Sequence, residues 1–551
     1  MNKMQSSICL LAVTLCWSTE VILLAALPDG INPLAFTCVT SIIATVLLFL
    51  CFGERILAAF KRDRGSIEKR LVLLAVLNTS YNVMYNAGLD YFDVSSGAFT
   101  LSMTAVILPV ILLVSKRGVN PKTWISAACV LIGIVAAVAP SMHTSQVGGL
   151  AVLIVGCILR AIYIVRLNDY ARQHDPVAIA AGMTCLNSII AFVPWNFVQP
   201  GTFLALPWSN TFIAVAVIYS YFIVAFATVL NIFAQRRATP AQATIIYATE
   251  IIFSIIWATL LPAGIVDHVD ISLPILVGCA LVVVGNLIEV APFMERLSKA
   301  ADALPDGAIA VDTKPQGDTT TAQSHDRLAT TQGHNEPTTT SPHGDPVAAL
   351  LSCLNSPVLR SIALFAILLA VYLIVSLPFK VLTVIPGFTD IRPVNMLVPA
   401  YGIFFGIPGC LAFGVGNLIS DIAADELRWT SIAGFISNFA YPYVLYLLYT
   451  RLSKKPFSLR TGKDLILFVL AIIACSIMEW LILAPAVHAV YPDVDIWVFT
   501  ASVLFNSIAF PVALAIPLII LIQEELGFVP LFKPKNERQP IDQHNKKALS
   551  D

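Results

Sequence analysis

Charged residues are scarce in this sequence. Only 12% of its 551 residues are Asp, Glu, Lys or Arg, whereas 57% are hydrophobic. Soluble globular proteins are nearer one quarter charged and one half apolar, so this composition excludes a water-soluble fold. The net charge of −1 gives no basic excess of the kind that binds nucleic acid. The composition therefore predicts an integral membrane protein without a nucleic-acid partner.

Several motifs of enzymes and cofactor-binding proteins are missing. The 11 cysteines stand singly in apolar runs, with no CxxC pair and no Cys/His cluster, so neither a disulfide framework nor a metal site is predicted. His143, His174, His268 and His488 lack paired spacing, and no set of nucleophile and base is visible. No GxxxxGK[ST] loop occurs, so any ATP-driven motor must be another protein. We expect no enzyme, no cofactor and no metal.

Residues 1–297 contain ten apolar runs of about the length that crosses a bilayer, ~20 residues. The runs fall at about 7–27, 33–52, 71–89, 94–115, 123–139, 148–166, 177–197, 211–234, 240–261 and 272–292. The loops between them alternate between basic segments, such as GERILAAFKRDRGSIEKR and SKRGVNPK, and segments without Lys or Arg, such as PDGIN and DYFD. This asymmetry predicts that the N-terminus and the basic loops are cytoplasmic, in a multi-pass protein of the plasma membrane.

A change of composition separates this unit from a second one. Residues 298–346 are rich in Thr, Asp, Pro and Gly and predict a disordered cytoplasmic linker. Residues 347–551 form the second membrane unit, with spans at about 359–377, 430–451, 463–487 and 496–522. The stretch 392–421 is too long for one helix, and a turn between Gly406 and Gly409 predicts two short spans there. Six spans put the C-terminus in the cytoplasm as well, although Lys380, Arg392 and Arg428 would then lie outside.

The first unit repeats itself. A shift of 145 residues lays Trp17 on Ile162 and Asn86 on Asn231, and residues 126–133 lie over 278–285 at a shift of 152. The two repeats cover about 7–140 and 147–292. Because each contains an odd number of spans, the copies must cross the membrane in opposite directions. The predicted fold is therefore all-α and polytopic, a ten-helix inverted-repeat permease followed by a six-helix membrane module.

The first unit resembles the EamA family of the drug/metabolite transporter superfamily over about residues 7–292. The resemblance is carried by Trp17, by YFDVSSGAFTLSMTAVILPV, by Gly278 and Gly285, and by the Glu of YATEIIFSIIW, where Ile251 replaces a proline common in the family. It implies a permease that moves a small molecule by alternating access, with the substrate between the two repeats.

The second unit resembles the substrate-binding S component of energy-coupling-factor vitamin transporters. Its first span carries Ala366 and Ala370, and small residues four apart let another helix approach closely. The phrase VPAYGIFFGIPGCLAFGVGNLISD supports the likeness. The resemblance implies that Ala366 and Ala370 dock on the membrane coupling subunit, which works with ATPase subunits.

Three charged residues lie inside the predicted spans of the first unit: Glu20, Arg160 and Glu250. A lone charge at the centre of a membrane costs at least ~2.5–3.5 kcal/mol, so we expect all three to face a common interior. Arg160 pairs with either Glu20 or Glu250, and one carboxylate is left over. Glu20 is thus either the counter-ion of Arg160 or a carboxylate that couples transport to protons.

Polar side chains accompany these charges. Asn78, Asn82 and Asn86 recur every four residues and share one helix face, with Tyr81 and Tyr85 beside them, and Asn231 lies on the corresponding helix of the second repeat. They line the substrate path or, alternatively, only tie helices together by hydrogen bonds.

In the second unit, Asn438, Glu479 and Asn506 come from three spans at a similar depth, ~12–15 Å from the outer end. This agreement predicts an outward-open pocket, with Trp480 as a stacking wall and Asn417 nearer the mouth. The predicted function is a small-molecule transporter fused to a substrate-binding module. The alternative is a membrane receptor whose second unit senses a vitamin-like ligand.

Overall fold

The computed structural model describes residues 1–25, 27–28, 31–89, 102–138, 147–202, 206–260, 272–290, 356–381, 383–385, 388–453, 457–525 and 527. Helices make up almost all of this part, apart from a short hairpin of β1 (Thr383–Ile385) and β2 (Thr389–Asp390). Eleven of the described helices are long and apolar enough to cross a membrane. The prediction of an all-α multi-pass membrane protein is confirmed, whereas the division into ten and six spans stays a prediction.

The N-terminal half contains the helices from α1 to α14. They are α1 (Lys3–Ser18), α2 (Glu20–Ala25), α3 (Pro33–Arg62), α4 (Ile67–Leu89), α6 (Met103–Val114), α7 (Pro121–Val138), α8 (Val147–Ala171), α9 (Pro176–Val198), α10 (Asn210–Tyr219), α11 (Ala227–Gln235), α12 (Pro240–Tyr247), α13 (Glu250–Leu260) and α14 (Leu273–Val290). A π-helical turn, η4 (Ser220–Phe226), joins α10 to α11. The predicted linker, 298–346, lies outside the described residues.

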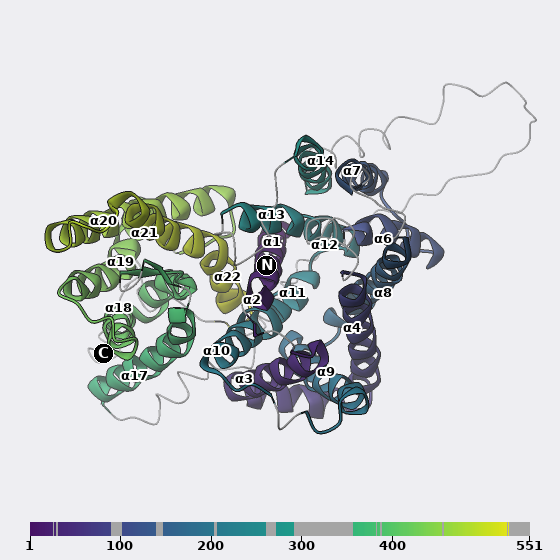
Figure 1. The fold of residues 1–551 in the computed structure, drawn as a ribbon, viewed down its shortest axis with the longest axis horizontal. Helices are drawn as coiled ribbons and strands as arrows, with labels where there is room; N and C mark the ends of the chain where they lie inside the picture. The colour runs from purple at the N-terminus through teal and green to yellow at the C-terminus, as the bar shows by residue number, and fades with distance from the viewer. Residues whose placement is uncertain are drawn as a thin grey trace, which may run out of the picture.

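These helices pair in a reciprocal pattern. Helix α3 packs on α9 and α7 packs on α14, so helices at matching positions of the two repeats meet each other. Helix α8 packs on α4 and α6, and its counterpart α1 packs on α11, α12 and α13, which correspond to them. Figure 1 shows α7 beside α14 and α3 beside α9. This exchange of equivalent contacts is what two-fold pseudosymmetry between two repeats produces.

Glycines allow the close approach of α7 and α14. A Cβ added to Gly133 would lie 2.9 Å from the carbonyl oxygen of Gly278, and one added to Gly285 would lie 3.0 Å from that of Ser126. The two contacts are reciprocal, because the repeat alignment lays 126–133 on 278–285. The hydroxyl of Ser126 also donates to the carbonyl of Gly285, at 2.9 Å.

Gly133→Ala should therefore destabilise the protein by about 1–3 kcal/mol, since backbone atoms of α14 cannot move aside for the new methyl group. The melting temperature in detergent measures this. Gly53→Ala is the matched control, because Gly53 lies on a helix with nothing within 4 Å of an added Cβ. Alanine is the better helix former, so the control should be neutral or stabilising. Equal effects of the two changes would show that α7 and α14 are not held in this contact.

Two predicted spans are broken near their acidic residues. In the first predicted span, α1 ends at Ser18 and α2 begins at Glu20. One continuous helix was expected over 7–27. In the ninth predicted span, α12 ends at Tyr247 and α13 begins at Glu250. In both, a threonine directly precedes the glutamate. Helix N-termini favour negative charge, so each carboxylate sits where the backbone stabilises it.

The C-terminal half contains α17 (Pro357–Ser376), α18 (Val398–Ala423), α19 (Thr430–Ser453), α20 (Gly462–Val490), α21 (Ile496–Phe510) and α22 (Ile516–Glu524). The 3-10 turns η5 (Leu377–Val381) and η6 (Pro393–Leu397) flank the hairpin, and the π-helical turn η7 (Pro511–Ala515) joins α21 to α22.

The chain folds back on itself within α18. Gly406 has φ 59° and ψ −138°, a conformation that glycine adopts without strain. The rings of Tyr401 and Phe413 lie 5.9 Å apart, whereas 12 residues of straight helix would separate them by ~18 Å. A side chain at Gly409 would collide with the carbonyl of Tyr401. The stretch thus has two arms that meet at the turn expected between Gly406 and Gly409.

The two halves pack against each other. Helix α1 contacts α22, and α10 contacts η5. Across this boundary the rings of Phe222 and Phe379 lie 5.3 Å apart, and those of Trp257 and Phe505 lie 6.5 Å apart. In Figure 1 the yellow end of α22 lies beside the purple α1, between the two groups of helices. The halves therefore share a hydrophobic interface in addition to the chain that joins them.

Glu525 forms a charged clasp at this interface. Its carboxylate pairs with Arg55 of α3 and lies 3.2 Å from Arg236, which follows α11. Arg55 also lies 2.7 Å from Asp175, the N-cap of α9. The clasp thus joins the end of α22 to three helices of the N-terminal half.

Cutting the chain at about residue 320 should leave two halves that stay associated, because the aromatic contacts and the clasp do not depend on the linker. A tag on one half should retain the other during purification in detergent. Glu525→Arg places a cation against Arg55 and Arg236 and should reduce this retention. Glu54→Gln, a change of an exposed carboxylate next to Arg55, is the control and should not. Clean separation of the unmodified halves would contradict the interface.

Candidate functional site

Arg160 of α8 occupies the centre of the N-terminal half. Only 9% of its side chain is exposed, and its guanidinium lies 3.5 Å from the carboxylate of Glu250. The guanidinium carbon also lies 5.6 Å from the ring centre of Trp17 and 5.9 Å from those of Tyr81 and Tyr247. Aromatic faces attract cations, so three rings and one carboxylate together hold this buried charge.

A small cavity adjoins this pair. The described residues on its wall are Ser102, Thr104, Ala105, Arg160, Thr244, Tyr247, Ala248 and Glu250. Its volume is ≈ 10 Å³, which is about the room that one water molecule needs. Helices α6, α8, α12 and α13 all contribute, so the cavity lies between the two repeats. The described residues thus leave little space beside Arg160.

Glu20 lies on the other side of this centre. The hydroxyl of Tyr219 donates a hydrogen bond of 2.6 Å to its carboxylate. Tyr219 is the last residue of α10, directly before the π-helical turn η4, and such turns are frequent at functional sites. The structure therefore places Arg160 within ion-pair distance of Glu250 and gives Glu20 a neutral partner.

Asn231 belongs to a neighbouring polar network. It is 3% exposed and accepts hydrogen bonds from Tyr247 and from Gln235, the latter at 3.0 Å. The amide of Gln235 also donates to the Tyr247 hydroxyl, at 2.9 Å. Because the ring of Tyr247 packs against that of Trp17, tilted by 60° with ring centres 5.1 Å apart, the network fixes one wall of the Arg160 site.

The asparagine stripe of α4 is only partly brought to this centre. Asn78, Asn82, Tyr81 and Tyr85 are half-buried, and the side chain of Asn86 lies outside the described part of the structure. Tyr81 contacts Arg160, and its ring lies 5.7 Å from that of Tyr163. Among the described residues that line the small cavity, none is an asparagine of α4.

The C-terminal half holds a second, larger cavity of ≈ 60 Å³. Four of the five predicted pocket residues lie on its wall: Asn417, Asn438, Glu479 and Asn506. They come from α18, α19, α20 and α21, which bring them together at one end of this half. Trp480 is not on the described wall; its indole donates to Thr500, at 2.9 Å, and it packs against the apolar cluster that contains the wall residues Val487, Phe499 and Val503.

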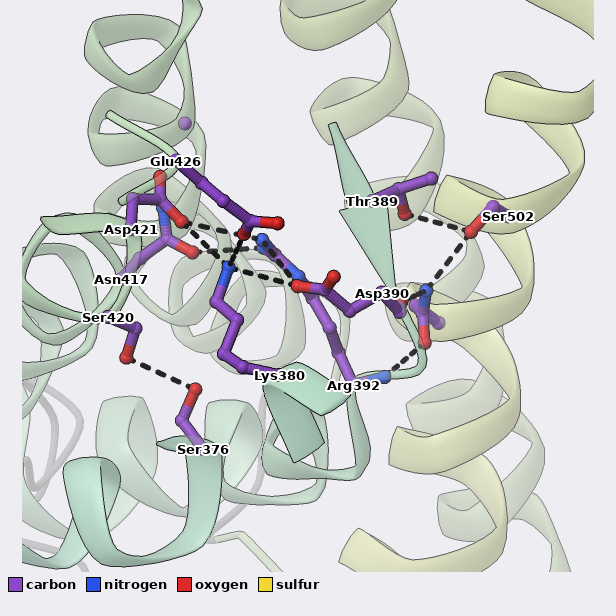
Figure 2. A network of polar contacts seen from close by, with 12 residues as sticks. Ser376, Lys380, Thr389, Asp390, Arg392, Asn417, Ser420, Asp421, Glu426 and Ser502 are labelled. Atoms are coloured by element: carbon purple, nitrogen blue, oxygen red, sulfur yellow. Dashed lines mark hydrogen bonds and ion pairs between the residues drawn. The ribbon is translucent and has the colours of Figure 1, made fainter. Parts of the chain in front are cut away.

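Lys380 is the centre of an ionic cluster at this cavity (Figure 2). Its ammonium lies 2.9 Å from Asp390, 3.1 Å from Asp421 and 2.8 Å from Glu426. Arg392 donates to the side chain of Asn417, at 2.9 Å. These contacts join the end of α17, the β-hairpin and the end of α18.

Asn506 anchors the hairpin to α21. Its side chain accepts a hydrogen bond of 2.7 Å from the backbone N–H of Arg392 and donates one of 2.8 Å to the carbonyl of Asp390. Thr389 and Ser502 hydrogen-bond each other at 2.8 Å, as Figure 2 shows. Asn438 donates to the carbonyl of Gly434 on its own helix, at 2.8 Å. Asn506 thus holds the segment that carries Asp390 and Arg392 against α21.

Ala366 and Ala370 lie on the outer face of α17, and both are exposed. This placement leaves them accessible to another helix in the membrane, and their docking role stays a prediction.

Some residues of these sites were not singled out from the sequence. Gln235 lies four residues after Asn231 on α11, a spacing that places both on one helix face, whereas Tyr247 belongs to α12 and no single-helix spacing links it to them. The predicted topology placed Lys380 and Arg392 on the outer side of the membrane, where the positive-inside pattern expects few cations. That conflict with the positive-inside pattern was the signal that these cations are buried in a pocket instead of exposed in a loop.

Comparison with known proteins finds one family for part of the first unit. Residues 4–139 match the EamA-like transporter family. The match covers the first of the two predicted repeats, and a transporter family there agrees with the prediction that the protein is not an enzyme. The resemblance of the second repeat to this family, and that of residues 347–551 to an S component, stay predictions.

Other comparisons add little. No curated protein matches the chain. One solved structure, described only as "Crystal structure of protein", is 16% identical, covers 52% of this chain and 98% of its own, and gives a TM-score of 0.42. A likeness of that degree does not define the fold.

Proposed function

We propose that the protein is a small-molecule transporter in which an alternating-access permease is fused to a substrate-binding membrane module. The observation that carries the proposal is the buried pair of Arg160 and Glu250, two residues of the second repeat, beside a cavity that residues of the first repeat also line. Intramembrane charges are costly and mark transport pathways, and inverted-repeat transporters place their substrate at the repeat interface.

The helix breaks support the same site. Glu20 and Glu250 each open a helical segment after an interruption, and discontinuous helices are common at the substrate and ion sites of secondary transporters. One cation faces two carboxylates, so one acid is free to exchange a proton or to receive a cationic group.

The second cavity supports a binding role for the C-terminal half. It is larger and more polar than the first and is built from the ends of separate helices. Because the halves share an interface and the Glu525 clasp, a ligand bound in one half has a physical connection to the other. This arrangement suits a transporter whose second unit captures the substrate.

Flux measurements on sealed vesicles that contain only the full-length protein test this function. A panel of labelled amino acids, amines and vitamins is offered from either side. We expect at least one compound to cross, and not to cross in vesicles with Arg160→Gln. If compounds bind but none crosses with the unmodified protein, the chain is a receptor.

We further propose that the exposed face with Ala366 and Ala370 docks an energy-coupling membrane subunit. Ala366→Trp should fill the space that a partner helix needs and abolish co-purification with that subunit, while ligand binding in the cavity persists. Ile466→Trp, a change of an exposed apolar residue on α20, is the control and should leave co-purification intact. Retention of the subunit by Ala366→Trp would remove this partner from the proposal.

A further inference from the structure

Glu479 stands out on the wall of the C-terminal cavity. It is only 5% exposed and lies on α20. Ser507 provides a hydrogen bond to its carboxylate, but among the residues that the structure describes none provides a hydrogen-bond partner for its Oε2 atom. A buried carboxylate oxygen that lacks a partner is unfavourable, so proteins rarely keep one that has no use.

The charges around this cavity leave it acidic. Four carboxylates, those of Asp390, Asp421, Glu426 and Glu479, accompany the two cations Lys380 and Arg392. Arg428 lies at the rim, 4.6 Å from the ring centre of Phe388. Even with Arg428 included, carboxylates outnumber cations. The field inside the cavity therefore favours a positive ligand over a negative one.

The existing cations are already engaged. Lys380 is held by three carboxylates, and Arg392 is held by Asn417 and lies 3.9 Å from Asp421 and 4.0 Å from Asp390. None of these contacts reaches Oε2 of Glu479. Oε2 of Glu479 is therefore an acceptor atom on the cavity wall that lacks a donor among the described residues.

The surroundings of Glu479 are apolar on its own side. Leu483 and Val487 follow it along α20, one and two turns further, and Phe499 and Val503 of α21 face them across the cavity. An ammonium group at Glu479 would thus have a short hydrocarbon body beside it. Polar groups at one end and an apolar wall at the other are the usual design of a small-molecule site.

We propose that this cavity binds a small primary amine, whose ammonium donates to Glu479 and whose hydrocarbon part packs on Leu483, Val487, Phe499 and Val503. This inference rests on the proposed function, since it names the ligand class of the capturing module. It predicts that the charge of the ligand, more than its shape, decides binding.

Three probes with the same hydrocarbon chain test the charge requirement: n-butylamine, 1-butanol and butyrate. Each is titrated against the full-length protein in detergent at neutral pH, and binding is followed by ligand-observed NMR. We expect the amine to bind at least tenfold more tightly than the alcohol, and butyrate to bind least. Equal affinity of the amine and the alcohol would overturn the inference.

Variants locate the site. Glu479→Gln should weaken amine binding at least tenfold and leave the weak binding of the alcohol unchanged. Glu479→Asp, which keeps the charge but withdraws it by one methylene, should give an intermediate loss and replaces the first variant if that one does not fold. Asp493→Asn is the control, because it removes an exposed carboxylate of the same half that is not on the described cavity wall, and it should bind the amine normally.

The outcomes separate this inference from the proposed function. Amine binding that survives Glu479→Gln and is lost in Glu250→Gln would place the amine in the permease and overturn the inference, while transport stands. Amine binding at Glu479 in a protein that moves no compound across vesicles would overturn transport, while the ligand class stands.

Discussion

Arg160→Gln should abolish transport and destabilise the protein by about 3–5 kcal/mol. The change removes one partner of a buried ion pair and leaves Glu250 as an uncompensated charge, which is the costly way to break such a pair. It also removes the cation that Trp17, Tyr81 and Tyr247 surround. The melting temperature in detergent and the flux of a compound found with the vesicle panel measure the two effects.

The double variant Arg160→Gln with Glu250→Gln separates the effect on stability from the effect on transport. Because it removes both charges, it should recover much of the lost stability and still fail to transport. Arg166→Gln is the matched control, since Arg166 lies on the same helix and is exposed, and it should change neither quantity. Normal flux with Arg160→Gln would exclude Arg160 from the transport pathway.

The broad architecture could be predicted because the bilayer imposes it. Runs of about 20 apolar residues, and the sides on which Lys and Arg gather, follow directly from the hydrocarbon thickness and from insertion. The pairing of 126–133 with 278–285 was also readable, since the small residues of each segment occupy matching positions. The structure places these same segments in contact through Gly133 and Gly285.

The local departures from regular helix could not be predicted in the same way. The breaks at Thr19 and at Ala248–Thr249 contain neither proline nor glycine, so the sequence there predicts an unbroken helix. The break at Gly406, by contrast, carries both signals nearby and was placed correctly. Tertiary contacts stabilise the first two, such as the 2.9 Å hydrogen bond from Trp257 to Ser18 and the 3.3 Å contact between Thr14 and Thr249.

The depth of polar residues, measured from the outer ends of their spans, predicted the residues of the second cavity better than those of the first. Asn417, Asn438, Glu479 and Asn506 lie on one wall because helices that end at the same membrane surface bring equal depths together. Trp480, predicted as a stacking wall, is not among the described residues of that wall, since neighbouring residues on a helix point about 100° apart. Its indole instead faces Thr500. Depth identifies the layer, and the helical rotation decides which side chain enters the cavity.

Glu20→Gln should fold normally and lose only the dependence of transport on a proton gradient. The glutamine oxygen can still accept the hydrogen bond from Tyr219, so the expected change in stability is below about 1 kcal/mol. Glu250→Gln should behave differently, because it leaves Arg160 without its carboxylate and should cost about 3–5 kcal/mol. The contrast between two chemically identical substitutions decides which acid is the counter-ion of Arg160.

Transport driven by a pH gradient across sealed vesicles measures whether Glu20→Gln has lost the dependence on protons. The charged and titratable groups near Glu20 are Tyr219, Arg160 and Glu250, and only Glu20 is a carboxylate without a cation at ion-pair distance among the described residues of this centre. Tyr219→Phe removes its hydrogen bond and should cost about 1–3 kcal/mol while the carboxylate remains. Coupling should therefore persist in Tyr219→Phe and vanish in Glu20→Gln. If Glu20→Gln keeps gradient-driven transport, Glu20 is not the coupling group; if it destabilises the protein as much as Glu250→Gln does, Arg160 pairs with Glu20.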